Sequence, residues 1–414
     1  MKKFGLILLL LLVSVFVMTQ INAASPIKVV IWEQDDPTGD ELMDKWAQEI
    51  NKLYPDIVVE RVHYSTEDLR SNFQTAALAG KGPHLVYGPY DNIGPFVTMG
   101  IIQPLDNFVP KDFLAKFDPT ALKGNMYQGK LWALPDRIGN HLCLLYNKKL
   151  VKVVPRDMDT FIKLAKSLTK DINKDGKIDQ WGLVYNLNEP YWLPPFLGGF
   201  GGWVMDDNAN PTLNTDAMVK ALQLVQDFKF KHKIVPPDCD YNLADTLFKE
   251  GKAAFLINGP WSFAGYVEAK VDFGVTRIPK INETGLWPTP MSGMKGYSVS
   301  KIVTDPKEKD AVLKVLMYFT DEKAQKEMLR KVKWLPTNKN ALKDPFINED
   351  PILKGSAYQL EVAKPMPIVP EMRAIWDAIR GPQELVMAGK MTPKDAAEAM
   401  QKDAEKRIKE MLGK

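Results

Sequence analysis

The sequence is poor in the residues that most often carry chemistry. It contains only two cysteines, Cys143 and Cys239, and four histidines that lie far apart. Two cysteines are too few for a disulfide framework, so we expect two separate buried thiols. No pair of histidines has the spacing of a zinc-binding helix, and the chain has no G-x-S-x-G elbow, phosphate loop or dinucleotide fingerprint. These absences argue against an enzyme.

The sequence also has little excess of charge of either sign. The formal net charge of the 414 residues is +3, from 54 basic and 51 acidic side chains. The basic residues form no run with interleaved aromatics, which is the pattern of many nucleic-acid-binding surfaces. We therefore expect no nucleic-acid partner.

Long hydrophobic runs are absent except near the N-terminus. Lys2 and Lys3 precede an apolar run from Phe4 to Met18, and the small-residue stretch INAAS follows. This order predicts a secretory signal peptide over residues 1–23. The run is shorter than the roughly 20 residues that span a bilayer. The mature chain is expected to be soluble in the periplasm or another extracytoplasmic space.

The chain also lacks a long Pro/Gly/Ser linker, although its length suggests two domains. Strand-like and helix-like segments alternate from the start of the mature chain, which predicts a doubly wound α/β fold. Three helices are expected to begin with capping boxes at Ser65, Asp305 and Thr392. Because no linker separates two halves, the chain should cross between its domains more than once. The strand-like runs are 27–32, 56–62, 84–88, 252–259 and 272–279.

Aromatic residues, in contrast, are plentiful. The chain has ten tryptophans, and several stand beside proline, glycine or acidic residues. Tyr191 and Trp261 each lie in a Pro-containing break after a strand-like run, and ligands bind at strand ends in open α/β sheets. An aromatic face can stack on a sugar ring while a carboxylate such as Glu189 accepts hydrogen bonds from its hydroxyls. These residues favour a sugar-binding site.

The stretch DINKDGKIDQWG, residues 171–182, has the oxygen spacing of a calcium loop. The twelfth position is Gly182, where an EF-hand needs a bidentate acid, so a calcium sensor is not expected. Two interpretations remain open: a turn without metal, or one structural calcium. Its ligands would be Asp171, Asn173, Asp175 and Asp179.

Several segments resemble one known family, the periplasmic maltose/maltodextrin-binding proteins of sugar ABC importers. They are YNLNEPYW, INGPWSF, VDFGVTRIP and PEMRAIWDAIR, with TAALAGKGP, LVYGPYDNIG and GKLWALP from the first half. The resemblance implies a two-lobed, type II "Venus-flytrap" fold with several crossings between lobes. Lobe 1 would contain 24–140 and 297–340, and lobe 2 would contain 141–296 and 341–414.

The resemblance also implies a set of ligand-binding residues. In its motifs, Tyr191, Trp261 and Trp376 match ring-stacking aromatics, and Glu189 matches a carboxylate that binds sugar hydroxyls. The remaining implied positions are Trp192, Arg380, Asp91, the pair Asp35 and Asp36, and Asn140, where the family has a glutamate. The sequence departs from the family at Gly88, where a stacking tryptophan is usual, and at Asn92, where an arginine is usual.

The resemblance implies a protein that binds its ligand and catalyses no reaction on it. A monomer would bind a maltose or maltodextrin by lobe closure and deliver it to the membrane permease of an ABC transporter, without a cofactor apart from the possible calcium. Trehalose or another oligosaccharide is an alternative ligand, and so is a peptide or polyamine. A secreted glycosidase that uses two carboxylates is a more remote alternative.

Overall fold

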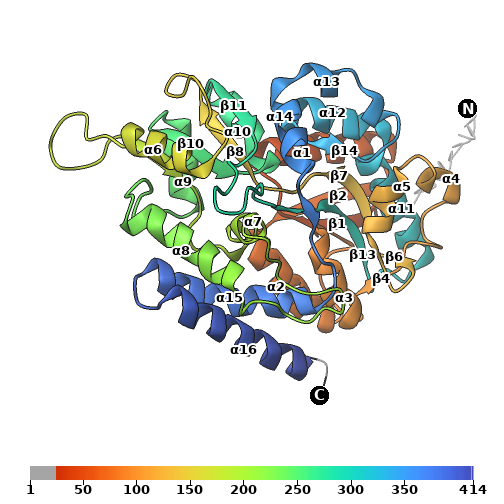
Figure 1. Cartoon of the computed structure of the whole chain (residues 1–414). Helices are drawn as coiled ribbons and strands as arrows, with labels where there is room; N and C mark the ends of the chain where they lie inside the picture. Colours follow the sequence, from red (N-terminus) through yellow and green to blue (C-terminus); the bar gives the residue numbers. More distant parts are fainter. Residues whose placement is uncertain (1–24, 412, 414) are drawn as a thin grey trace, which may run out of the picture.

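Two β-sheets organise the chain in the computed structural model, which describes residues 25–411 and 413 (Figure 1). The predicted signal peptide lies outside the described residues. We call the part built around the larger sheet the first lobe and the part built around the smaller sheet the second lobe. In Figure 1 the first lobe lies on the right and the second on the left.

The larger sheet has seven strands in the order β14-β7-β13-β3-β1-β2, with β4 paired to β13. Strands β1, β2 and β3 are parallel to one another, and β13 runs antiparallel to β3 and β7. The carboxyl ends of three neighbouring strands therefore meet at one edge. The strands are β1 (Ile27–Glu33), β2 (Ile57–His63), β3 (Leu85–Pro89), β4 (Ile102–Gln103), β7 (Leu134–Ile138), β13 (Met294–Ser300) and β14 (Leu335–Pro336).

The smaller sheet has four strands in the order β11-β8-β10-β9. Strands β9 and β10 are parallel neighbours, and β8 runs antiparallel to β10 and β11. The strands are β8 (Cys143–Asn147), β9 (Trp181–Val184), β10 (Ala253–Asn258) and β11 (Phe273–Thr276). Two short ribbons, β12 (Met291–Ser292) with β15 (Lys364–Pro365) and β5 (Met126–Tyr127) with β6 (Lys130–Leu131), complete the strands.

The described chain passes between the two sheets at three places. The first passage joins β7 to β8, the second joins β11 to β13, and the third follows β14. The helices after the third passage pack on the second lobe, because α14 contacts β11, and α15 and α16 contact α8. The C-terminal helices thus cover a lobe that began some 200 residues earlier in the chain, as Figure 1 shows.

Helices cover both sheets, and their first turns explain where they begin. Ser65 accepts a hydrogen bond from the Asp68 amide, and Asp305 accepts from the Lys307 and Glu308 amides. The same arrangement at Thr392 and Asp395 confirms the third predicted cap. In the first lobe the helices are α1 (Pro37–Leu53), α2 (Thr66–Leu78), α3 (Ile93–Thr98), α4 (Lys111–Leu114), α5 (Pro119–Gly124), α11 (Pro306–Thr320) and α12 (Glu322–Val332).

The second lobe contains the remaining α-helices. They are α6 (Met158–Leu168), α7 (Pro194–Gly199), α8 (Asp216–Phe230), α9 (Tyr241–Lys249), α10 (Phe263–Glu268), α13 (Phe346–Glu349), α14 (Pro351–Leu360), α15 (Glu371–Met387) and α16 (Pro393–Met411). Helix α6 lies close against β9 because Gly182 has no side chain. A Cβ atom on Gly182 would lie 2.0 Å from the Ala165 carbonyl oxygen.

Both cysteines are buried and free, which confirms the prediction of two separate thiols. Burial raises the pKa of the Cys239 thiol to about 12 and raises that of Cys143 as well. Neither thiol is therefore a reactive nucleophile at neutral pH.

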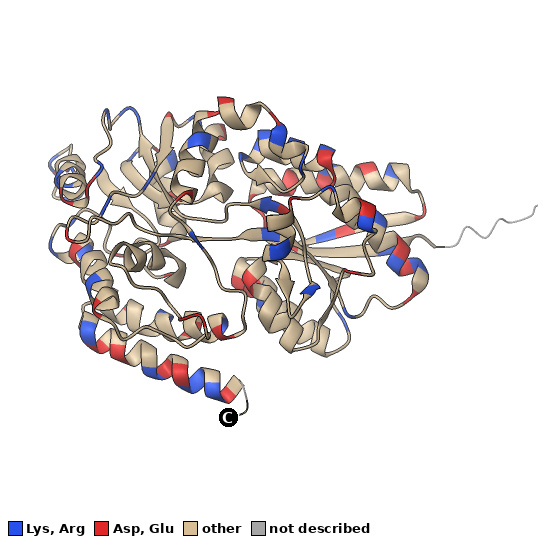
Figure 2. Cartoon of the chain, turned by 45° about the vertical axis from the view of Figure 1, so that its right-hand side comes forward, with Lys and Arg blue, Asp and Glu red and all other residues tan. Residues whose placement is uncertain are grey.

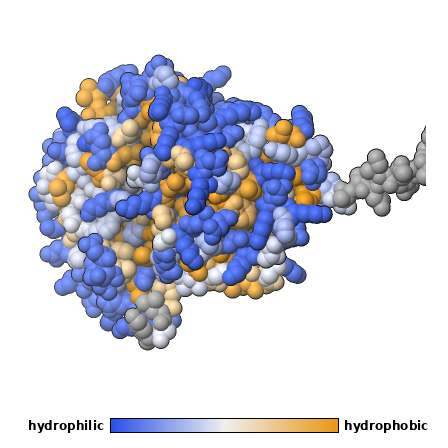
Figure 3. All heavy atoms as spheres, turned by 90° about the vertical axis from the view of Figure 1, so that its right-hand side faces the viewer, coloured by the Kyte–Doolittle hydropathy of each residue, from blue (hydrophilic) through white to orange (hydrophobic). Residues whose placement is uncertain are grey.

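The surface carries both signs of charge. Figure 2 shows acidic and basic residues interspersed, for example along α16, where Arg407 pairs with Asp403 at 2.8 Å. The face drawn in Figure 3 is covered mainly by hydrophilic residues, with apolar atoms scattered among them. Among the described helices, none has the length and apolar character needed to cross a bilayer.

Candidate functional site

Two short turns at the carboxyl ends of β9 and β10 carry the central aromatic residues. The turn η2 (Pro190–Trp192) follows β9 after a short loop, and η3 (Pro260–Ser262) follows β10 directly. Each turn has a proline in its first position, where the fixed φ angle favours the turn and no amide hydrogen is lost from a ladder. Since β9 and β10 are parallel neighbours, the two turns lie side by side. The fold therefore brings Tyr191 and Trp261 together from positions 70 residues apart.

Three aromatic rings form a continuous row in the second lobe. Tyr191 is in the middle, with its ring centroid 6.2 Å from that of Trp261 and 6.1 Å from that of Trp376 on α15. The ring planes are tilted by 58° and 60°, so the three rings do not form one flat surface. We call these three residues the aromatic row. Such rings can stack on the C–H faces of successive sugar units.

Trp192 and Trp334 pack near Trp261, at one end of the row. Trp192 is only 6% exposed, and its indole N–H donates to the Ile257 carbonyl at 2.9 Å. Its ring lies edge-on to Trp261 at 6.3 Å. Trp334, from the first lobe, is 1% exposed, and its ring centroid lies 6.3 Å from that of Trp261. Trp261 thus packs against the cores of both lobes.

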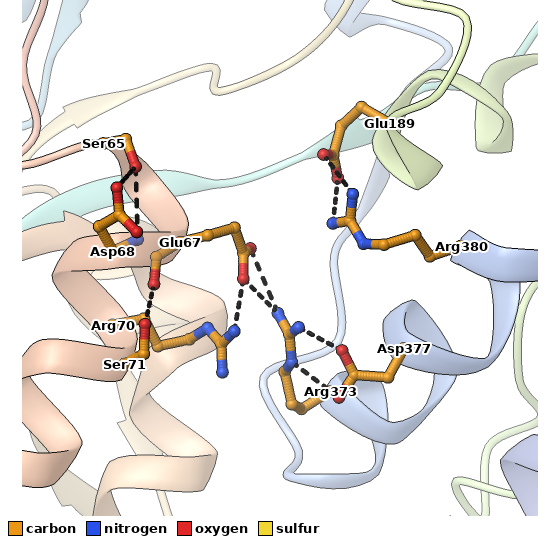
Figure 4. Close-up of polar contacts among 9 residues, drawn as sticks. All are labelled: Ser65, Glu67, Asp68, Arg70, Ser71, Glu189, Arg373, Asp377 and Arg380. Atoms are coloured by element: carbon orange, nitrogen blue, oxygen red, sulfur yellow. Dashed lines mark hydrogen bonds and ion pairs between the residues drawn. The ribbon is translucent and has the colours of Figure 1, made fainter. Parts of the chain in front are cut away.

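Glu189 and Arg380 lie beside the row as a bidentate ion pair. Arg380 Nη1 and Nη2 donate to the two Glu189 oxygens at 3.1 and 3.2 Å (Figure 4). Burial raises the pKa of Glu189, while the Arg380 charge acts in the opposite direction. The pair holds the carboxylate in a fixed orientation, which suits it to accept a hydrogen bond from a ligand hydroxyl.

Asp91 comes from the first lobe, in the turn η1 (Tyr90–Asn92) at the carboxyl end of β3. Its Oδ1 atom is buried and has no hydrogen-bond partner among the described residues. Burial raises the pKa of Asp91 to about 6, with a further contribution from the nearby Glu67 charge. A buried acceptor without a partner is costly, so a donor from a ligand that reached this oxygen would satisfy it.

The predicted pair Asp35 and Asp36 is divided between two environments. Asp35 is 3% exposed, and its Oδ2 lies 2.9 Å from Nη1 of the fully buried Arg137. Arg137 also pairs with Asp136 at 3.0 Å and stacks on Trp334 at 5.2 Å from the ring centroid. Asp36 is half-buried and forms no capping bond to α1. Of the two carboxylates, Asp36 is therefore the one free to meet a ligand.

Asn140 lies in the first passage between the sheets. Its amide donates to the Gly293 carbonyl at 3.0 Å, and its own carbonyl accepts from the Tyr191 hydroxyl at 2.8 Å. The backbone of Asn140 thus anchors the middle ring of the aromatic row to the passage. At Gly88, a Cβ atom would lie 3.3 Å from Asn92 Nδ2, so the amide side chain of Asn92 packs directly beside this glycine.

The loop at 171–182 lies on the surface between α6 and β9, away from the aromatic row in the chain. Its carboxylates accept backbone amides: Asp171 from Asp175 at 3.2 Å and from Gly176 at 2.9 Å, and Asp179 from Ile172 at 2.7 Å. Gly176 has a φ of +89°, as a sharp turn requires. The donor set is of the oxygen type that calcium prefers, and the structural calcium stays a prediction.

Elsewhere in the described chain, one group of acidic and histidine ligand atoms gathers within 4.8 Å: Glu33, Asp40 and His63. Arg61 already lies among them, with its Nη1 atom 3.3 Å from Glu33 and 2.6 Å from Asp40. The guanidinium accounts for this cluster without a metal.

Two residues beside the site were not anticipated from the sequence. Arg373 lies three residues before Trp376 on α15, and it pairs with Glu67 from the first lobe. The helical spacing of Arg373, Trp376 and Arg380 was a usable signal, because residues three or four apart share a face. Nothing in the sequence indicated Glu67 as the partner, since the two are 306 positions apart.

The chain is similar to known proteins along most of its length. The family model for a bacterial extracellular solute-binding protein matches residues 45–355. A maltotriose-binding protein of Pyrococcus abyssi is 31% identical over 362 residues, covering 86% of this chain and 76% of that protein. A galactooligosaccharide-binding protein of Bacillus subtilis is 28% identical, covering 92% of this chain and 90% of that protein.

Solved structures show the same likeness. The maltose/maltodextrin-binding domain MalE from Bdellovibrio bacteriovorus, bound to maltotriose, matches with a TM-score of 0.90 and 43% identity, covering 92% of this chain and all (100%) of that one. The maltotriose-binding protein of Thermus thermophilus, bound with maltotriose, matches with a TM-score of 0.84 and 26% identity, covering 92% of this chain and 100% of that one. The fold is the two-lobed periplasmic-binding-protein fold, which confirms the predicted class. The chain belongs to the bacterial extracellular solute-binding protein family.

Proposed function

We propose that this protein captures a maltodextrin-type oligosaccharide outside the cytoplasm and delivers it to the permease of an ABC importer. The observation that carries the proposal is the aromatic row of Tyr191, Trp261 and Trp376, with the Glu189 carboxylate fixed beside it. A row of tilted rings suits a curved chain of sugar units better than a small cation or a peptide. The maltotriose-binding relatives and maltotriose-bound neighbours support the same ligand class.

The proposed mechanism is capture by closure. The second lobe binds the sugar first, through stacking on the aromatic row and hydrogen bonds to Glu189. Rotation about the three passages then brings Asp91 and Asp36 of the first lobe to the sugar and excludes water. Because only the closed form makes both sets of contacts, the sugar shifts the population toward it.

The decisive test is calorimetry of the purified mature protein against a panel of sugars. We expect maltotriose and maltose to bind with one sugar per chain, and trehalose and cellobiose to bind more weakly. A galactooligosaccharide belongs in the panel because a galactooligosaccharide-binding protein is 28% identical to this chain. Preferential binding of that sugar would replace the maltodextrin proposal, and failure of every sugar to bind would refute sugar capture altogether.

Further experiments address the partners and the absence of chemistry. Incubation with maltotriose should release no glucose, which distinguishes a binding protein from a glycosidase. Light scattering should give the mass of a monomer. The sugar-loaded protein should stimulate the ATPase activity of the cognate importer in membrane vesicles. An importer that responds equally without the protein would contradict the delivery role.

A further inference from the structure

An ion pair joins the two lobes beside the candidate site. Arg373 Nη1, on α15 of the second lobe, lies 3.2 Å from Oε1 and 3.1 Å from Oε2 of Glu67, on α2 of the first lobe. Figure 4 shows the two side chains extending toward each other from their helices, and Figure 1 shows α2 beside α15. The pair therefore exists only while these two helices are close together.

Each partner is held in place by its own lobe. Glu67 also accepts a hydrogen bond from Arg70, one turn further along α2. Arg373 also donates to Asp377, one turn further along α15, with Nε 3.2 Å from Oδ2. Because both side chains are oriented before they meet, pairing them costs less side-chain entropy than pairing two free side chains on a surface.

The pair lies close to the residues of the site without belonging to the aromatic row. Arg373 precedes Trp376 by three positions on the same helix. Its charge lowers the pKa of Asp91, whereas the Glu67 charge raises it, so both groups lie within electrostatic reach of that carboxylate. The side chain of Arg373 is 21% exposed and that of Glu67 is 46% exposed, so water reaches the pair from one side.

Two other ion pairs that join the lobes lie at a passage of the chain between them. Arg330 pairs with Asp344 at 2.6 Å and Lys333 pairs with Asp350 at 2.7 Å, both at the third passage between the lobes. Groups next to a hinge change their separation little when the lobes rotate. Glu67 and Arg373 lie on helices outside the passages, so opening separates them and returns both charges to water.

We propose that Glu67 and Arg373 form a latch that stabilises the closed form and raises sugar affinity without contacting the sugar. The proposal rests on the proposed function. A contact made only in the closed form increases the population of that form, and apparent affinity rises by the same factor. For a partly exposed ion pair, the expected factor is about 2- to 5-fold.

The test is a double-mutant cycle on sugar affinity. The variants are Glu67→Gln, Arg373→Gln and the double variant, each measured by calorimetry with maltotriose and by stopped-flow tryptophan fluorescence. We expect each single variant to bind about 2- to 5-fold more weakly, with faster sugar dissociation, and the double variant to bind no more weakly than either. The difference should shrink at high salt, because screening weakens the pair.

Two further variants separate the latch from other roles. Arg373→Lys keeps the positive charge and should recover part of the lost affinity. Arg407→Gln removes an ion pair within α16, Arg407 with Asp403, and should leave affinity unchanged. Urea unfolding of the sugar-free variants reports any effect on the fold itself.

The outcomes distinguish the alternatives. An equal loss of affinity for maltose, maltotriose and maltotetraose supports the latch, because the latch acts on the lobes. A loss that grows with sugar length indicates direct contact with the sugar and overturns it. A coupling between Glu67 and Arg373 that appears in the free energy of unfolding but not in sugar affinity also overturns the latch. Unchanged affinity in the variants, when the wild-type protein binds maltotriose, overturns it as well. If the wild-type protein binds no sugar, the proposed function fails, and the latch fails with it.

Discussion

Replacing Trp261 with alanine should weaken sugar binding more than any other change in the aromatic row. The Trp261 ring lies 6.2 Å from Tyr191 in the row, 6.3 Å from Trp192 and 6.3 Å from Trp334 of the first lobe. Its removal therefore takes away one stacking surface and also the wall that positions Tyr191. A partly buried aromatic residue of this kind typically contributes about 1–3 kcal/mol to binding.

This free energy corresponds to an affinity about 5- to 150-fold weaker. Calorimetry with maltotriose measures it directly, and Trp261→Phe should lose less because it keeps a ring. Since Trp261 packs against the cores of both lobes, the variant will also unfold more easily. Urea unfolding without sugar must therefore be measured alongside, under conditions in which the variant is folded.

Trp203→Ala is the matched control. Trp203 is a half-buried tryptophan of the second lobe that lies outside the aromatic row, with Lys364 5.0 Å from its ring centroid. Its loss should change stability but leave affinity for maltotriose within about 2-fold. An unchanged affinity in folded Trp261→Ala, or an equal loss in Trp203→Ala, would refute the assignment of the row as the sugar platform.

Three other predictions follow from the structure. In Asp91, burial raises the folded pKa to about 6, so the folded state binds more protons than the unfolded state between about pH 4 and 6. The unfolding free energy of the sugar-free protein should therefore fall as pH rises through that window, and Asp91→Asn should flatten the urea-unfolding profile. Arg137→Met should lower the free energy of unfolding by about 3–5 kcal/mol in the same urea assay, since it leaves the carboxylates of Asp35 and Asp136 buried without their partner. A decrease below about 1 kcal/mol would contradict this reasoning. If the loop at 171–182 holds calcium, a chelator should lower the melting temperature, and Asp171→Ala should abolish that sensitivity. An equal melting temperature with and without chelator would refute the calcium site and favour a turn without metal.

Much of the local structure followed from the sequence. The capping residues Ser65, Asp305 and Thr392 are hydrogen-bonded as predicted, because a side chain at a helix start meets amides only two or three residues away. The Pro-containing breaks at Tyr191 and Trp261 indicated turns at strand ends for the same local reason. Cys143 and Cys239 are both free, as predicted for a chain with too few cysteines for a disulfide framework.

The roles of neighbouring residues did not follow from the sequence. Tyr191 and Trp192 are adjacent in the chain, yet Tyr191 lies in the aromatic row, and Trp192 is buried with its N–H bonded to Ile257. Asp35 and Asp36 are also adjacent, and only Asp35 meets Arg137, 102 positions away. Local patterns cannot separate such neighbours, because the difference lies in what the rest of the fold places against each side chain.

The sequence by itself determined the α/β character, several helix starts and the aromatic character of the site, because these depend on periodicity, turn chemistry and residue type, and the two-lobed class followed from the family resemblance. The tertiary structure alone decided which charges meet. Glu67 and Arg373 are 306 positions apart and belong to different lobes, and they pair because α15, which packs on the second lobe after the third passage, lies beside α2 of the first lobe (Figure 1). Pairing between distant charges depends on distances of a few ångströms, and only the packed chain sets those distances.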